Sequence, residues 1–180
     1  IIPDAAARAV AYETGKVDVL TGGSVDVYDV ARLSKLPNTC MTTKGWEMFA
    51  PHAWLTPNVR NGILGNKQFR QGLMYAIDRE FGKDVVWGGL GKLPTGPISS
   101  KTKFYSGDVP KYSYDPAKAK ELIKASGYKG ETIRLLNLPY GETWSRWSEA
   151  IKQNLEDVGV KVQIENTDVP GWTQKASNWD

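Results

Sequence analysis

One stretch in the last third of the chain restricts the possible folds more than any other. Apolar residues at 132–136 predict a strand, the apolar spacing over 144–158 predicts an amphipathic helix, and residues 160–165 alternate as a second strand. A helix between two strands is a crossover long enough for the strands to pair in parallel. The chain is therefore predicted to be α/β or α+β, with helices packed on a mixed sheet.

Residues that cap helix ends indicate further helices. Asp4 precedes an alanine-rich run, Asn66 precedes an amphipathic run, and Asp115 stands before Pro116 at the start of a third run. Each of these residue types accepts hydrogen bonds from the free N–H groups of a first helical turn. Helices are expected over residues 4–15, 26–36, 66–79, 115–127 and from 170 onward.

The remaining segments are expected to be extended or irregular. Short strands are predicted at 17–20 and 39–43, and the aromatic stretch 46–55 is predicted to be extended. Residues 87–116 are rich in glycine and proline and have little periodicity, which predicts a long surface loop. A loop of that length is usually functional or stabilising.

Charge and composition argue against several classes of function. The 180 residues carry 23 basic and 20 acidic side chains mixed along the chain, so no block of one sign indicates a nucleic-acid partner. Apolar runs such as 73–77 are far shorter than the roughly 20 residues of a membrane-spanning helix. Cys40 is the only cysteine, which excludes an internal disulfide.

Catalytic patterns are also weak. His52 is the only histidine, so neither a histidine-rich zinc site nor a Ser-His-Asp triad is indicated. The glycine run at 88–92 departs from a phosphate-binding loop at Val86 and Leu93. No cofactor or metal is predicted, and the protein is not expected to be an enzyme. Twenty acidic residues nevertheless leave open a hydrolase domain with unrecognised catalytic carboxylates.

Tryptophan is unusually frequent, with seven against four phenylalanines. Packing alone is served by phenylalanine, which has no N–H to satisfy, so some tryptophans are candidates for a hydrated stacking surface. Trp147 has apolar neighbours at helical spacing and is expected in the core. Trp144 follows Tyr140 and Glu142 at a loop-to-helix junction after a strand, where clefts of α/β proteins open, and is the better site candidate.

Several segments together resemble one family. They read T-G-K-V-D-V at 14–19, F-R-Q-G-L-M-Y-A-I-D-R at 69–79, G-P-I at 96–98, Y-D-P-A-K-A-K-E-L at 114–122 and I-K-Q-N-L at 151–155, followed by V-G-V. In this order and spacing the chain resembles the extracytoplasmic solute-binding proteins of peptide-type ABC importers, a family that includes oligopeptide, dipeptide and nickel binders.

The resemblance implies a role and a place in a larger molecule. Residues 24–180 would be most of the C-terminal large lobe of a periplasmic-binding-protein-like fold (type II, cluster C-like), and residues 1–23 would be a helix, a strand and a lobe-joining segment. The whole protein would act as a monomer in the periplasm or another extracytoplasmic space. It would capture a peptide between two lobes and pass it to a membrane permease. An oligosaccharide or a nickel complex is the alternative solute.

Ligand-facing positions follow from the same resemblance. Dipeptide binders place an arginine for the ligand carboxylate just before a Pro-Tyr pair, whereas Leu138 precedes Pro139 and Tyr140 here, which argues against a short free peptide. The expected ligand-binding residues are Gly22, His52, Trp54, Tyr140, Glu142 and Trp144.

Overall fold

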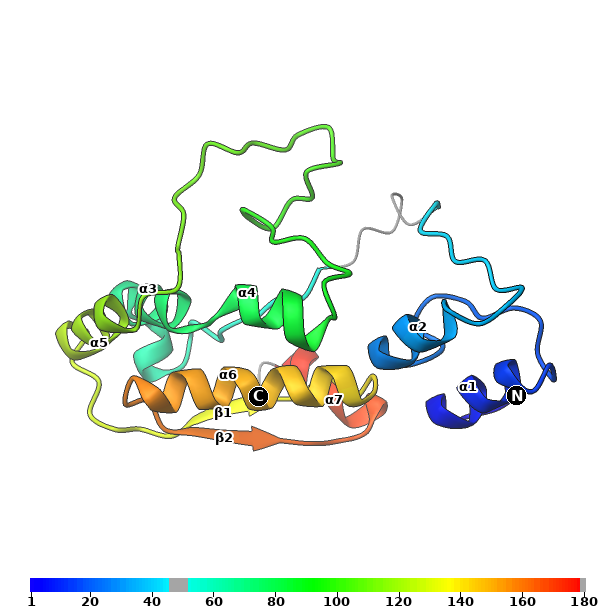
Figure 1. The fold of residues 1–180 in the computed structure, drawn as a ribbon. Helices are drawn as coiled ribbons and strands as arrows, with labels where there is room; N and C mark the ends of the chain where they lie inside the picture. Colours follow the sequence, from blue (N-terminus) through cyan, green and yellow to red (C-terminus); the bar gives the residue numbers. More distant parts are fainter. Residues whose placement is uncertain (46–51, 179–180) are drawn as a thin grey trace.

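A computed structural model describes residues 1–45 and 52–178 (Figure 1). Its helices are α1 (Ala5–Glu13), α2 (Val27–Leu33), the 3₁₀ helix η1 (Gly62–Gly65), α3 (Lys67–Ala76), α4 (Arg79–Phe81), the π-helix η2 (Gly82–Val86), α5 (Pro116–Ala125), α6 (Glu142–Asp157) and α7 (Val169–Asn178). Its strands are β1 (Ile133–Leu136) and β2 (Val162–Glu165). Among the described residues, no helix is long and apolar enough to cross a membrane.

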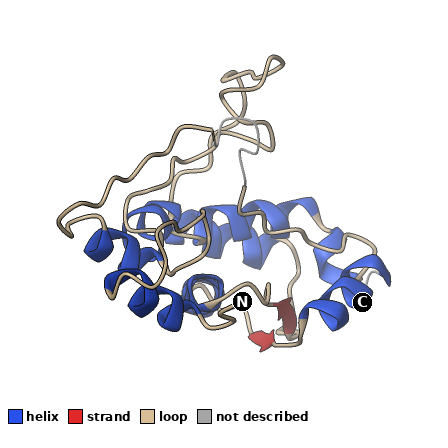
Figure 2. Cartoon of the chain, turned by 90° about the vertical axis from the view of Figure 1, so that its right-hand side faces the viewer, coloured by secondary structure: helices blue, strands red, loops and turns tan. Residues whose placement is uncertain are grey.

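The predicted β-α-β unit is confirmed. Strands β1 and β2 pair in parallel, with Ile133 opposite Val162 and Leu136 opposite Glu165. Helix α6 connects them and lies along the strand pair, with α3 and α4 on the far side of α6 from the strands (Figures 1 and 2). The predicted α/β class is therefore correct, and within the described residues the sheet consists of this pair of strands.

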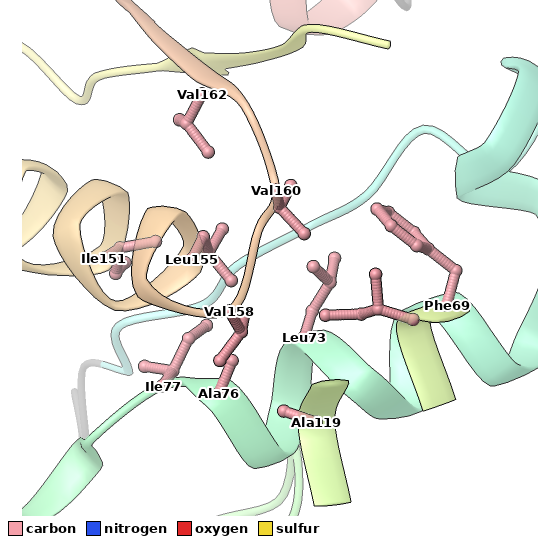
Figure 3. Packing of buried hydrophobic residues seen from close by; sticks show 11 residues of the cluster. Phe69, Leu73, Ala76, Ile77, Ala119, Ile151, Leu155, Val158, Val160 and Val162 are labelled. Carbon is pink, nitrogen blue, oxygen red and sulfur yellow. The ribbon is translucent and has the colours of Figure 1, made fainter. Parts of the chain in front are cut away.

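One apolar cluster holds these elements together (Figure 3). Phe69 and Leu73 of α3 meet Ile151 and Leu155 of α6 in this cluster, and Val160 joins them just before β2. Phe69 is 0% exposed and Val160 is 1% exposed. Burial of such side chains stabilises the fold by about 1.5–3 kcal/mol each. The cluster fixes α6, and therefore the loop before it, relative to α3 and α5.

The predicted helix starts are confirmed by their capping bonds. Asp4 accepts from the Ala7 N–H (2.7 Å), Asn66 from the Gln68 N–H (2.8 Å) and Asp115 from the Lys118 N–H (2.9 Å). Helix α3 ends at Ala76, three residues before the predicted end. Ile77 is extended there because the next N–H, that of Asp78, is bound by the side chain of Asn154 (2.9 Å).

The strands predicted at 17–20 and 39–43 do not form, which corrects the expectation. A strand requires a neighbour to accept its backbone hydrogen bonds. Instead, the N–H groups of Lys16 and Val17 bond back to the Ala11 carbonyl at the end of α1 (2.8 and 3.3 Å), and Val19 is 73% exposed. Part of the stretch 46–55 lies outside the described residues, and 52–55 form no regular element.

The long loop is confirmed. Residues 88–115 contain no helix or strand, and most of them are exposed. The loop rises above α3 and α4 before it returns to α5 (Figure 1). Its last residue, Asp115, donates its N–H to the Tyr75 carbonyl (2.8 Å), which ties the returning chain to α3.

Candidate functional site

A buried asparagine organises the chain where β1 ends. Asn137 is 5% exposed, and its amide donates to Ser145 Oγ (3.1 Å) and Asn166 Oδ1 (2.9 Å). Its Oδ1 accepts from Ser148 Oγ (2.8 Å). The network joins the end of β1 to α6 and to the residue after β2. It therefore holds the following loop at the carboxyl edge of the parallel strands, where α/β proteins bind ligands.

Tyr140 lies in the loop that the Asn137 network holds, and Glu142 lies at the start of α6. Tyr140 is 62% exposed. Gly141 has φ 100°, a left-handed conformation that glycine adopts without strain, and turns the chain directly into the helix. Glu142 was expected in the loop but is the first residue of α6, because the turn is completed at Gly141. Its carboxylate pairs with Arg146 one turn later (Nε–Oε1 3.0 Å).

Trp144 belongs to a cluster of three indoles. The ring of Trp87 lies edge-on to Trp144 and to Trp147, with centroids 5.6 and 5.5 Å apart. Trp147 is partly buried against the core, as predicted, and its ring passes so close to Gly82 that a Cβ there would lie 2.5 Å from Cζ3. Trp144 is half-buried. The indole expected to contact a solute is thus packed against another indole.

Charged groups connect α2 to the same end of α6. The Arg146 guanidinium lies over the Tyr28 ring, 4.5 Å from its centroid. Burial raises the pKa of Asp26 above its usual range, and the nearby carboxylates of Glu142 and Asp29 raise it further, while Arg146 opposes them. The edge of the candidate site therefore carries several carboxyl groups and one guanidinium group, that of Arg146.

The profile described as bacterial extracellular solute-binding proteins, family 5 Middle, matches residues 1–180. The chain belongs to this family.

Its relatives bind different solutes. The glutathione-binding protein GsiB of Pectobacterium atrosepticum is 34% identical over 63% of this chain and 22% of its own length. Heme-binding protein A of Haemophilus influenzae is 29% identical over 90% of this chain and 30% of its own length. The Helicobacter pylori periplasmic binding protein DppA, solved with the peptide STSA, is 25% identical, with a TM-score of 0.85 over 97% of this chain and 33% of its own. The chain thus spans between about a fifth and a third of these proteins.

The other residues predicted to contact ligand in this family 5 protein lie in two further segments. His52 is half-buried and Trp54 is 66% exposed, with ring centroids 6.1 Å apart. Within the described part of the chain, this is the ring contact that Trp54 makes. Gly22 is exposed in a turn closed by the Ser24 N–H and the Thr21 carbonyl (3.0 Å). Trp46, in the same aromatic stretch, and Trp179 lie outside the described residues.

Several residues of this region were not predicted. Arg146 stands four residues after Glu142. This spacing favours ion pairs on a helix, so it could have predicted the contact between the two side chains. Trp87 was assigned to the long loop, and its contacts with α6 join residues about 60 positions apart, which no local pattern reveals. No local sequence pattern predicts the hydrogen-bond network of Asn137, because one of its partners, Asn166, lies beyond the crossover helix.

Proposed function

We propose that the protein containing this chain is the substrate-binding component of an ABC transporter. It captures a peptide or a similar polar solute between two lobes and delivers it to a membrane permease. Residues 24–180 contribute one large lobe and residues 1–23 the segment that joins it to the other. The protein works as a monomer in the periplasm or another extracytoplasmic space, and it binds the solute without changing it. Support comes from the family match along the whole chain.

The observation that carries the proposed site is the exposed side chain of Tyr140 on a backbone fixed by the Asn137 network. A phenol on a fixed backbone presents both a flat apolar face and a hydroxyl, and a tyrosine side chain has few rotatable bonds to order when a solute packs on it. Trp144, held by Trp87, extends the aromatic surface. Residues Gly22, His52 and Trp54 contribute from the joining segment and the aromatic stretch.

Glu142 supplies the polar contact of the site. Its ion pair with Arg146 is exposed, and such pairs contribute at most about 1 kcal/mol. A solute ammonium or hydroxyl group therefore competes for the carboxylate at little cost. This favours solutes that carry hydrogen-bond donors, as peptides do.

Peptides are the preferred solute class among those that relatives bind. Relatives are named for glutathione and solved with the peptide STSA, although others are named for heme or solved with a nickel-histidine complex. Leu138 cannot pair with a carboxylate at the position before Pro139. A peptide longer than a dipeptide is therefore favoured, because its terminus can be recognised elsewhere.

The test is a thermal-shift screen of the whole protein against tri- to pentapeptides, oligosaccharides and nickel-histidine. Peptides are expected to raise the melting temperature, because a ligand at 100 times its Kd adds about 2.7 kcal/mol of stability. Tyr140→Ala should weaken this shift and leave the unliganded melting temperature nearly unchanged. Tyr114→Ala is the matched control, because Tyr114 is also exposed (46%) but lies just before α5, outside the candidate site.

Each other outcome has a defined meaning. A shift with oligosaccharides or nickel-histidine alone would replace the peptide by that solute. A lack of shift with every class would contradict the proposal, and recovery of cleaved peptide would contradict binding without chemistry.

A further inference from the structure

A hollow lies between α3 and the long loop, apart from the candidate solute site. Its volume is about 560 Å³, within the range of about 300–1,000 Å³ that small-molecule sites occupy. Helix α3 and Arg79 form one wall, and loop residues 93–96 and 110–113 form the other. None of its lining residues belongs to the Asn137 network or to the tryptophan cluster.

The charge of this hollow has one sign. Its lining includes Lys67, Arg70, Arg79 and Lys111 and contains no aspartate or glutamate. Lys67 and Lys111 are exposed, and the described residues offer neither ammonium group a hydrogen bond or an ion pair. Some lysines elsewhere on the surface do pair with carboxylates, as Lys118 does with Glu121 (3.0 Å). The positive charge of the hollow is therefore uncompensated by its own walls.

The two arginines are held in place by carbonyl groups and not by carboxylates. Arg70 donates through Nη1 to the carbonyls of Leu64 (2.9 Å) and Gly65 (2.8 Å), and Arg79 donates through Nη2 to the Tyr112 carbonyl. Both side chains are half-buried. A guanidinium has five N–H donors, so each arginine keeps donors beyond these bonds. Fixed guanidinium groups with free donors suit carboxylate or phosphate oxygens, which they bind in pairs.

An apolar surface stands beside these cations. Met74, Leu93 and Tyr112 line the hollow together with prolines of the loop. Tyr112 is fixed by its hydroxyl, which accepts from Gln71 (3.3 Å), and by edge contact with Tyr75, whose ring centroid is 5.2 Å away. A ligand that fills this space must therefore offer carbon surface as well as negative charge.

We propose that this hollow is a second binding site, for a small organic anion that carries a carboxylate or phosphate on an apolar skeleton. The anionic group meets Arg70 and Arg79, Lys67 and Lys111 add long-range attraction at the rim, and the skeleton packs on Met74 and Tyr112. The site is independent of the peptide site proposed above, because the two share no residue.

Titration of the whole protein tests this, with 4-phenylbutyrate and phenyl phosphate as probes and the uncharged 4-phenylbutyramide as the matched neutral compound. Both anions should bind more tightly than the amide, and added salt should weaken them. The double variant K67E/K111E should lose at least about tenfold in affinity for the anions, equivalent to about 1.4 kcal/mol. It spares Arg79, which holds the loop at Tyr112, and Arg70, which holds η1. The variant K101E/K120E changes the net charge equally at exposed lysines outside the hollow, and should bind as the unaltered protein does.

Several results would overturn the proposal. They are equal affinity for the amide and the anions, equal loss in the two double variants, and lack of binding of both anions at millimolar concentration. Binding of an oligoglutamate peptide without binding of either small anion would also overturn it, in favour of an acidic protein partner. The peptide-induced thermal shift should be the same in K67E/K111E, so failure of this site and failure of the proposed function are distinguishable.

Discussion

Asp26 is a carboxyl group whose surroundings disfavour its charge. It lies at the start of α2, half-buried, and makes no capping hydrogen bond there. Burial is the main reason that its pKa is raised above the ordinary value of 3.8, and Glu142 is the next. The ionised side chain thus adds repulsion at the place where α2 meets the start of α6.

Asp26→Asn is expected to stabilise the protein at neutral pH and to have little effect in acid. The native state holds the Asp26 proton more tightly than the unfolded chain does, so the contribution of this group to stability is present below pH 3.8 and is lost as the pH rises through the raised pKa. Urea unfolding from pH 3 to 7 measures the difference. The stability difference between Asp26→Asn and the unaltered protein should grow with pH. Asp18→Asn is the control, because Asp18 is exposed, and its stability difference should not follow this trend. A difference that does not depend on pH would contradict the account.

Gly82 illustrates how an element depends on one missing methyl group. The π-helix η2 begins at this residue, with ordinary helical angles (φ −53°, ψ −53°), and alanine would normally be preferred there. The Trp147 ring occupies the space that a Cβ would need. The close approach of η2 and α6 therefore requires glycine for its size and not for its backbone freedom.

Gly82→Ala is accordingly expected to destabilise the protein by about 1–3 kcal/mol, the usual penalty for overpacking. Denaturant unfolding followed by tryptophan fluorescence measures it, because the three indoles lie at this contact. Gly91→Ala is the control, since nothing lies within 4 Å of a Cβ built there and its φ is not positive. A stabilised Gly82→Ala protein would show that helix propensity outweighs the contact with Trp147.

Helix α3 contributes the largest fully buried side chain of the core. Phe69 is 0% exposed and packs on the Tyr128 ring at 5.2 Å between centroids. Phe69→Ala should cost about 3–5 kcal/mol in unfolding free energy. Phe104→Ala, in the long loop where Phe104 is 77% exposed, should change it by no more than about 0.5 kcal/mol. Similar losses from both changes would mean that the loop is packed.

Local sequence patterns predicted the helices and strands that are marked by capping residues or by apolar periodicity. The capped helices α1, α3 and α5 and the β-α-β unit were found because capping and periodicity act within a few residues. The strands expected at 17–20 and 39–43 failed because alternation shows only that a segment suits a sheet and does not supply a partner. The tryptophan cluster and the Asn137 network were missed since both join distant residues. The family resemblance, in contrast, was carried by motif order and was correct.

At the scale of the whole molecule, this chain provides one surface of the proposed binding site. The carboxyl edge of the strands, the start of α6 and the α1–α2 segment lie toward the same end of the fold (Figure 1). The chain spans 22–33% of the relatives described above, and the proposed function assigns the opposing surface to the rest of the protein. The proposed capture of a solute rests on closure of two such surfaces around it.

The most direct test is a crystal structure of the whole protein with the solute that it retains on purification. The account predicts a peptide or similar polar solute between two lobes, with atoms within about 4 Å of Tyr140 and Trp144. A solute bound elsewhere, without contact to either side chain, would contradict the central claim.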